Sequence, residues 1–511
     1  MKKIVLAALI MSIGALLIGV LSTSNVVRYE DFGAKGDGVT DDRIAIVKAH
    51  AAANDRGVPV RVTDGKVYYV GPGDESAIVK TDVDFGTAKI IIDDRNVKKR
   101  NSPLFRVMSD KPPYEISGVK ALKKGASNIG VKLPEKSLVH LYCDGIRRYI
   151  RFGPNQDKGS PQQEVVFVDE NGDIDQKAQV IWDFPCVTKV TVYPVDKKTL
   201  VISGGVFQTI ANQCESKYLY HNRGFHITRS NVLIRNVRHE VTGELDHGAP
   251  YSGFFTIDYS ANVRVENCVL TGHRIYMTIG SAKCPVPMGS YDITVGNSVN
   301  VVFAGCRQTN DFKDGSFWGI MGSNYCKNML LDDCEFSRFD AHMGVANATV
   351  KNSKMGHMGM NAIGTGKFLV ENTSLYSERF ITLRTDYGST WEGEFVVKNC
   401  KFYPRNIKER GVALIHGHND GNHDFGYECF MPHTITIDGL EIFDADHAPE
   451  YDGPSIFGFF NSKYIDDSYV EKYPYRKTEK VILKNIKTQS GKKLAIRANH
   501  AMFKNVKVIE H

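Results

Sequence analysis

The segment Val263–Cys268, which reads Val-Arg-Val-Glu-Asn-Cys, decides the fold because its pattern recurs through the second half of the chain. Each copy has alternating apolar residues, then Asn, Asp or Gly, and then Cys or another small or apolar residue. The Asn/Asp/Gly position of the copies falls at residues 236, 267, 305, 333, 352, 372, 399, 439, 485 and 505. The shortest intervals between copies are 19 and 20 residues, and the longer intervals fit the same unit with an inserted loop.

A period near 20 residues with strand-like alternation predicts an all-β solenoid. Helical repeats need about 33 residues or more, and the signature of leucine-rich repeats is absent. A parallel β-helix over residues 200–511 remains, in which the Asn/Asp/Gly column forms the bend between two strands of each coil. The next position points inward, so we expect an interior column of mainly unbridged thiols, made of Cys268, Cys306, Cys334 and Cys400.

Each coil is predicted to carry a further strand, with a large apolar residue at its third position and a small residue at its second. The large residue faces the core, and the small residues together form the floor of a shallow outer groove. These strands are predicted at Phe255–Asp258, Met277–Gly280, Trp318–Met321, Met343–Ala346, Asn361–Gly364, Ile381–Arg384, Ala413–His416 and Phe457–Phe460.

The N-terminus predicts export from a bacterial cell. Lys2 and Lys3 precede the apolar run Ile4–Leu21, and Ser22–Ser24 supplies small residues for cleavage, so residues 1–24 are interpreted as a signal peptide. An uncleaved anchor is the alternative, because the run is just long enough to span a bilayer. We expect a periplasmic or secreted protein. The net charge of +6 over 511 residues is too small and too scattered to favour nucleic acid as a partner.

The segment Asp31–Asp42 reads Asp-Phe-Gly-Ala-Lys-Gly-Asp-Gly-Val-Thr-Asp-Asp, and a helix-like pattern follows it at residues 41–54. This segment resembles the N-terminal signature of the pectate-lyase-like superfamily, which includes polysaccharide lyases, polygalacturonase-like glycosidases and tailspike-type depolymerases. The resemblance implies a right-handed parallel β-helix, an N-terminal capping helix and a carbohydrate substrate. The catalytic motifs of polygalacturonases do not occur here as a set, so no catalytic residue is transferred.

Four parts of the chain follow from these patterns. Residues 1–24 are the signal peptide, and residues 25–125 form the N-terminal cap and the first coils. Residues 126–199 alternate aromatic and charged residues, which predicts a β-rich insertion or elaborated coils. Residues 200–511 form the parallel β-helix that carries the groove.

Ionisable side chains crowd both ends of the predicted groove strands. Consecutive coils bring them within about 5 to 15 Å of one another, because neighbouring strands are about 4.8 Å apart. The expected catalytic residues are His342, His357, Arg384 and Tyr387. The expected substrate-binding residues are His273, Arg274, Asp311, Trp318, Asp340, Asp386 and His416.

Two reactions on a sugar polymer fit these side chains. In a lyase, Arg384 neutralises a uronate carboxylate, His342 or His357 takes the α-proton, and Tyr387 is a candidate acid for the leaving oxygen. In a hydrolase, two carboxylates act about 5.5 Å apart for retention or about 6.5–9.5 Å apart for inversion. The available carboxylates are Asp258, Asp311, Asp340 and Asp386.

The prevalence of His, Arg and Tyr over carboxylates favours the lyase, with an acidic polysaccharide or oligosaccharide as its substrate. A non-catalytic carbohydrate-binding β-helix is a third hypothesis, and it predicts a row of aromatic side chains along the groove instead.

Metal signals are weaker. Asn419–Asp424 is rich in oxygen ligands and suits Ca²⁺, but it lacks the terminal Glu of an EF-hand, and a solvated loop is the alternative. His416 and His418 suit a transition metal only if a third ligand joins them. Calcium is therefore the one cofactor considered, and no metal ligand is assigned.

Overall fold

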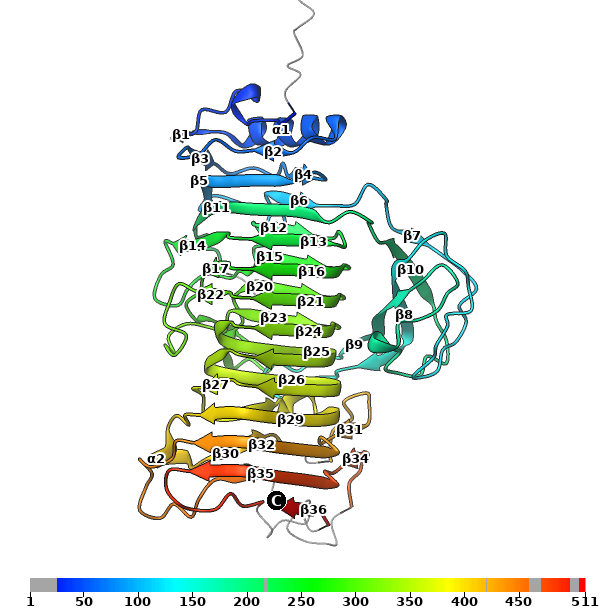
Figure 1. Cartoon of the computed structure of the whole chain (residues 1–511), viewed down its shortest axis with the longest axis vertical. Helices are drawn as coiled ribbons and strands as arrows, with labels where there is room; N and C mark the ends of the chain where they lie inside the picture. Colours follow the sequence, from blue (N-terminus) through cyan, green and yellow to red (C-terminus); the bar gives the residue numbers. More distant parts are fainter. Residues whose placement is uncertain (1–24, 216–218, 420, 459–469, 497–504, 511) are drawn as a thin grey trace, which may run out of the picture.

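The computed structural model describes residues 25–215, 219–419, 421–458, 470–496 and 505–510. The predicted signal peptide, residues 1–24, lies outside the described residues. The chain forms a tall stack of parallel strands, with an insertion attached to one side (Figure 1). Helix α1 (Arg43–Arg56) covers the N-terminal end of the stack, as the sequence predicts. None of the helices in the described parts of the chain is long and apolar enough to span a membrane.

The stack has three parallel faces, which the chain visits in the same order in each coil. The first face consists of β4 (Ala77–Val79), β6 (Phe105–Val107), β12 (Phe225–Ile227), β15 (Ser252–Asp258), β20 (Tyr291–Gly296), β23 (Met321–Asn324), β28 (Arg379–Leu383), β30 (Ala413–His416) and β33 (Ser455–Phe457). The second face contains β2 (Val60–Arg61), β13 (Val232–Arg235), β16 (Ala261–Glu266), β21 (Val299–Ala304), β24 (Lys327–Asp332) and β36 (Lys507–Glu510).

The third face contains β1 (Asp37–Asp41), β3 (Val67–Val70), β14 (Arg238–Thr242), β17 (Val269–Leu270), β22 (Arg307–Gln308) and β27 (Ser374–Leu375). Five long strands run from the second face onto the third: β5 (Val83–Asp93), β11 (Leu200–Ile210), β29 (Trp391–Phe402), β32 (Thr434–Ile442) and β35 (Lys480–Thr488). Strands β25 (Glu335–Lys351) and β26 (Lys354–Glu371) cross all three faces.

The predicted bend column is confirmed from residue 236 to residue 485. Its asparagine and aspartate residues there have positive φ, from 48° at Asn372 to 57° at Asn236, which is the left-handed region that Asn and Asp tolerate better than most residues. The prediction is wrong at Asn505, which precedes β36, a strand that pairs with the second-face part of β35. Each bend turns the chain from the second face to the third. The interior thiol column is also confirmed, since all four predicted cysteines are buried and unbridged.

A second asparagine column, which the sequence analysis missed, stands where the first face turns into the second. Asn231, Asn262, Asn300, Asn328 and Asn347 all have φ between 57° and 59°. From Asn262 onward, each side-chain amide donates to the side-chain oxygen of the preceding asparagine, at 2.9 to 3.2 Å. Each of these asparagines precedes a bend residue by five positions, and that spacing is the signal in the sequence.

The predicted register of the groove strands is partly wrong. Met277–Gly280 does not belong to the stack, because β18 (Tyr276–Ile279) pairs with β19 (Pro285–Met288) in an antiparallel hairpin. The coil instead uses β20, where Thr294 pairs with Gly322. Apolar and polar residues alternate in the same way in a hairpin strand and in a coil strand. The pattern alone therefore assigned the hairpin strand β18 to the coil and missed the true coil strand β20.

The outward column of the first face therefore differs from the predicted floor of small residues. It passes from coil to coil through Thr256, Thr294, Gly322, Asp340, Asn361, Thr382 and His416. Polar side chains thus stand in the middle of this face, and not only at its ends.

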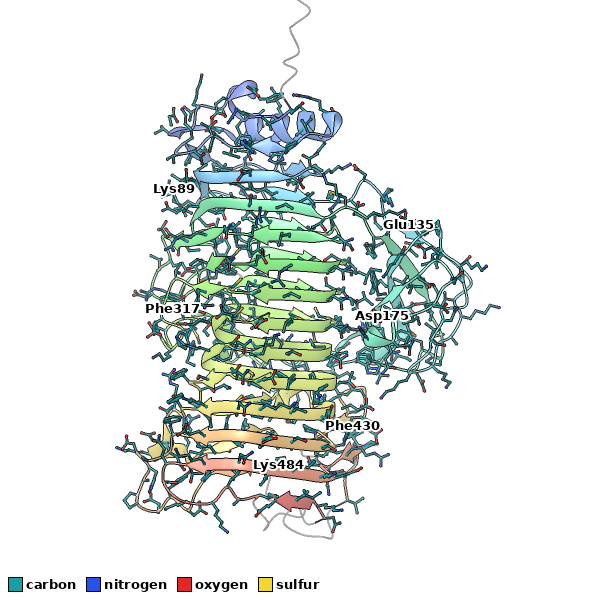
Figure 2. All side chains as sticks on the ribbon, viewed as in Figure 1. Lys89, Glu135, Asp175, Phe317, Phe430 and Lys484 are labelled. Carbon is teal, nitrogen blue, oxygen red and sulfur yellow. The ribbon has the colours of Figure 1, made fainter. Side chains whose placement is uncertain are left out.

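The insertion begins after β6 and returns to the stack at β11. Its antiparallel sheet has the order β7 (Tyr114–Glu115), β10 (Lys189–Pro194), β8 (Ser137–Arg148) and β9 (Ser160–Val168), around a core of its own. Figure 2 shows the insertion, marked by Glu135 and Asp175, on the side of the stack opposite Phe317. It docks through the buried ion pair of Lys327 and Glu164, whose Nζ and Oε2 are 2.6 Å apart.

The remaining short elements lie in loops. They are η1 (Glu30–Phe32), η2 (Gln176–Ala178), η3 (Thr385–Tyr387), α2 (Ile407–Arg410) and the paired strands β31 (Cys429–Phe430) and β34 (Tyr475–Arg476).

Candidate functional site

Three adjacent coils place the centre of the candidate site on the first face. In the pairing of β25, β26 and β28, Asp340 lies beside Asn361, and Asn361 lies beside Thr382. Side chains with a spacing of two along extended backbone share a face, so Arg338 joins Asp340. Arg384 joins Thr382 in the same way, because it directly follows β28 and is also extended. Most of the predicted catalytic and binding residues lie on or next to this surface.

Arg338 and Asp340 form a buried ion pair under this surface. Arg338 Nη2 is 2.9 Å from Asp340 Oδ2, and the two residues are 2% and 0% exposed. The side-chain oxygen of Asn361 accepts from Arg338 Nε at 2.8 Å and from Nη2 at 2.6 Å. Burial raises the pKa of the Asp340 carboxyl, although the Arg338 and Arg384 guanidiniums oppose this.

A second cluster is more accessible. Arg384 binds Asp386 through two contacts, Nε to Oδ1 at 3.0 Å and Nη2 to Oδ2 at 2.7 Å. Arg151 of the insertion donates its Nε to the same Oδ2 at 2.7 Å. The three side chains are 18% to 22% exposed. Although burial opposes it, the two guanidiniums hold the pKa of Asp386 below its usual value.

His342 lies beside this cluster as a neutral base. Burial, reinforced by the charges of Arg384, Arg338 and Arg151, lowers the pKa of His342 well below its usual value. Its Nδ1 is 2.8 Å from Asn324 Oδ1. An amide oxygen only accepts hydrogen bonds, so Nδ1 carries the proton and the lone pair is on Nε2.

Tyr387 packs between the charged groups. It is 3% exposed, its ring meets the His342 ring edge-on at 5.4 Å, and the Arg151 and Arg384 guanidiniums lie 5.1 and 5.2 Å from its centroid. Burial raises the pKa of Tyr387 to about 12, so the phenol stays protonated at neutral pH. These contacts hold the two arginines in place.

The other predicted residues gather at the opposite edge of the first face, around the loop of residues 309–320. His357 Nδ1 lies 3.2 Å from the carbonyl oxygen of Phe312 in that loop, and burial lowers the pKa of His357. The Trp318 amide donates to the His273 carbonyl at 2.7 Å. His357 and His342 therefore belong to different clusters, and Asp311 is exposed on the loop itself.

His273 is paired within the protein. Its ring nitrogens lie 3.1 Å from Glu244 Oε1 and 3.3 Å from Asp292 Oδ1, and it is 1% exposed. Although burial alone would lower it, these carboxylates raise the pKa of His273 to about 10. Arg274 is turned toward the ring of Phe317, 5.6 Å away.

Arg338 connects the two clusters. Its guanidinium is 5.7 Å from the Trp318 ring centroid on one side and pairs with Asp340 on the other. Arg338 Nη1 and Trp318 Nε1 are both buried without a hydrogen-bond partner in the described structure. One coil further on, His416 follows Thr382 in the outward column, and burial lowers its pKa.

The structure adds residues that the sequence analysis did not select. Arg338 and Asn361 could have been predicted from Asp340. Arg338 precedes Asp340 by two positions on the same strand, and Asn361 is its partner on the next strand. Arg151 could not have been predicted, because nothing in the neighbouring sequence indicates that it contacts Asp386. Of the other carboxylates, Asp258 lies at the end of β15, and burial raises its pKa to about 6.

Within the described ranges, no group of three or more His, Cys, Asp or Glu side chains is arranged to hold a metal ion. Asp420, part of the predicted calcium loop, lies outside those ranges. A cavity of about 270 Å³ opens where the insertion meets the stack. Its lining includes Lys124, Arg148, Tyr149, Trp182, Thr365, Glu392, Tyr427 and Phe430.

Comparisons with known proteins address the fold. No protein-family model matches the sequence, and no curated protein sequence matches it. Tailspike gp61 of Pseudomonas phage phi297 has 14% identity and a TM-score of 0.57, over 95% of this chain and 84% of that chain. Tailspike gp49 of Pseudomonas phage LKA1 has 14% identity and a TM-score of 0.47, over 92% and 82%. The adhesin PfbA of Streptococcus pneumoniae has 15% identity and a TM-score of 0.44, over 91% and 99%.

The similarity to tailspike gp61 spans nearly the whole chain. It agrees with the three parallel faces of the stack. The chain is a right-handed parallel β-helix protein.

Proposed function

We propose that the protein is an exported enzyme that degrades an acidic, uronate-containing polysaccharide by β-elimination. One observation carries this proposal: His342 is held neutral, with its lone pair on Nε2, beside a cluster in which guanidiniums outnumber ionised carboxylates. A neutral base next to fixed positive charge is what abstraction of a proton α to a carboxylate requires. The β-helix fold and the resemblance of its N-terminal segment to polysaccharide-degrading proteins support the substrate class.

The charges suit a carboxylate substrate. Arg151 and Arg384 share the single carboxylate of Asp386, which leaves one positive charge at a partly exposed position. A sugar carboxylate that approaches these guanidiniums gains charge-assisted hydrogen bonds. Arg384 therefore does not stand alone in binding the carboxylate, and Arg151 shares that role.

In the proposed reaction, His342 Nε2 takes the proton from the carbon next to the uronate carboxylate. The electrons of the broken C–H bond form the new carbon–carbon double bond, while the bond to the leaving glycosidic oxygen breaks. Arg384 and Arg151 stabilise the charge that builds on the carboxylate oxygens. The leaving oxygen takes a proton from water or from Tyr387, whose phenol is protonated.

Hydrolysis is the second candidate, because the pKa values of Asp340 and Asp386 are shifted in opposite directions. A raised carboxyl and a lowered one are the pattern of a general acid and its charged partner. Asp340 is 0% exposed, however, whereas Asp386 is 22% exposed on its side chain. A buried acid requires the Arg338 pair to open before a sugar reaches it.

A panel of acidic and neutral polysaccharides distinguishes the candidates. Elimination produces both new reducing ends and the ultraviolet absorbance of an unsaturated uronate, whereas hydrolysis produces reducing ends alone. The lyase proposal expects both signals on an acidic polymer, and their loss in His342→Gln. If only reducing ends form, and Asp340→Asn abolishes them, the result supports the hydrolase. If neither signal appears on any of the polymers, the result contradicts both candidates.

A further inference from the structure

Two cysteines of the insertion touch each other. Cys143 Sγ and Cys186 Sγ are 3.1 Å apart. Cys143 is buried on β8, whereas Cys186 is exposed on the segment that leads into β10. In the interior column, the thiols of Cys306 and Cys334 donate to backbone carbonyl oxygens of their own and the preceding coil.

The backbones around this pair are held in place on both sides. Tyr142 and Lys189 are partners in the antiparallel pairing of β8 and β10. Thr188 donates its amide to the Tyr142 carbonyl at 2.8 Å, and its hydroxyl accepts from the Asp144 amide at 3.2 Å. Phe184, before Cys186, is also fixed by backbone hydrogen bonds to Leu122.

The remaining distance is small. A disulfide needs a sulfur–sulfur separation of about 2.05 Å, so the two atoms must approach by about 1 Å. Rotation of the exposed Cys186 side chain supplies a movement of this size, because its surroundings are solvent on one side. The flanking hydrogen bonds fix the backbone next to each cysteine.

We propose that Cys143 and Cys186 form a disulfide that staples the insertion, independently of the proposed function. The exposed Cys186 thiolate attacks one sulfur of a disulfide oxidant, forms a mixed disulfide and releases the first thiol. The Cys143 thiolate then attacks the Cys186 sulfur and releases the second thiol. Two electrons and two protons pass from the cysteine pair to the oxidant, which is reduced to two thiols.

The position of the staple gives it a consequence for the candidate site. Strand β8 continues from Cys143 to Arg148 and then into the segment that carries Arg151. That segment lies on the β-helix, since the Ile150 amide donates to the Phe425 carbonyl at 3.0 Å and Arg151 pairs with Asp386. A disulfide at Cys143 therefore anchors the start of the segment that extends from Cys143 to Arg151 at the candidate site. Such bonds persist in oxidising compartments, in agreement with the predicted export.

The test uses the purified full-length protein, reduced and then treated with oxidised glutathione. The contact with Cys143 raises the pKa of Cys186, so the reaction is run at about pH 8.5 to provide thiolate. The protein is then denatured, alkylated without reduction and digested for mass spectrometry. We expect a cross-linked peptide that joins Cys143 to Cys186, two hydrogens lighter than the sum of its parts.

Two controls make the result decisive. The exposed Cys214 and Cys284 provide matched single thiols, which we expect to carry glutathione or the alkylating group and no cross-link. Cys186→Ser, at an exposed position, is expected to fold normally and to leave Cys143 alkylated. Cys186 bearing glutathione beside an alkylated Cys143, or both cysteines alkylated after oxidation, would overturn the proposal.

Protease digestion of the native protein gives an independent readout. The pair closes a loop of 42 intervening residues, and constraining such a loop slows opening of the insertion. We expect the oxidised protein to be cut within residues 108–199 on the order of tenfold more slowly than the reduced protein. Cys186→Ser should show the same rate before and after oxidation.

Discussion

Arg151 and Asp386 join the insertion to the β-helix through one contact, from Nε to Oδ2 at 2.7 Å, across 235 positions of the chain. The same carboxylate oxygen accepts from Arg384 Nη2 at 2.7 Å. Asp386 therefore balances two guanidiniums, one from each part of the protein. The candidate site is complete only when the insertion is docked, so the β-helix alone does not determine its charge.

Removal of Arg151 tests this dependence. In Arg151→Ala, Asp386 pairs with Arg384 alone, so the excess positive charge of the cluster is lost. The pKa of Asp386 then rises toward its usual value. We expect turnover of an acidic polymer to fall on the order of tenfold or more, and the effect on KM to be larger at low salt than at high salt, where the charge is screened. Arg151→Lys should recover part of the activity because it keeps the charge.

The matched control is Arg235→Ala, which removes an exposed arginine from the second face. It should leave turnover and KM unchanged. Equal activity of Arg151→Ala and the wild type would show that the insertion does not contribute to the site.

The acid limb of the pH profile tests His342. A base is active only when it is unprotonated, and burial among arginines lowers the pKa of His342 well below the usual value of about 6.5. We therefore expect kcat to stay level as pH falls through 6.5 and to decline only at lower pH. A decline centred at or above 6.5 would contradict a buried neutral base.

The same shift acts on stability with a defined sign. The unfolded state binds the His342 proton at a higher pH than the folded state does, so stability falls as pH drops below about 6.5. Circular dichroism at each pH separates this loss from the titration of kcat. His342→Gln should abolish most turnover at every pH while it keeps the folded spectrum.

The repeat was enough to predict the stack, because bend residues and inward residues recur at fixed positions that only a solenoid satisfies. The outer face was harder to predict. Inward positions such as Val295 and Leu331 must be apolar, but outward positions obey no such rule. The register of Asp340 against Asn361 therefore had to come from strand pairing, and the hairpin at Met277 looked the same as a coil strand.

The sequence predicted only those parts of the candidate site that come from neighbouring coils of the repeat. Asp340, His342, Arg384 and Asp386 fall on neighbouring coils, so the repeat placed them near one another. His357 was misplaced relative to His342, because the sequence does not show that a loop covers one edge of the face. Arg151 was beyond reach, since its partner depends on how the insertion folds back.

Docking of the insertion depends on the ion pair of Lys327 and Glu164, whose side chains are 1% and 2% exposed. Glu164 also accepts from the amides of Ile181 and Trp182. In Lys327→Met a buried carboxylate loses its cation, and we expect a cost of about 3–5 kcal/mol. Lys327→Met with Glu164→Gln should recover part of this cost, because the buried charge is gone.

Urea unfolding and protease digestion of the insertion measure both variants. If Lys327→Met is as stable as the wild type, the ion pair does not hold the insertion. If the double variant is no better than the single one, the loss lies in packing of the lysine stem and not in the unpaired charge.

The second asparagine column stabilises the coils in two ways that substitution at Asn300 separates. Asn300 has a φ of 59°, donates to Asn262 at 3.0 Å and accepts from Asn328 at 2.9 Å. Asn300→Gly keeps the left-handed backbone and loses the ladder, at an expected cost of about 1 kcal/mol. Asn300→Ala also strains the backbone, which adds about 1 kcal/mol to the loss of stability measured by urea unfolding.

Asn171→Ala, at an exposed turn, should change stability by less than about 0.5 kcal/mol. Equal stability of the Gly and Ala variants would mean that the backbone geometry at this corner carries no cost.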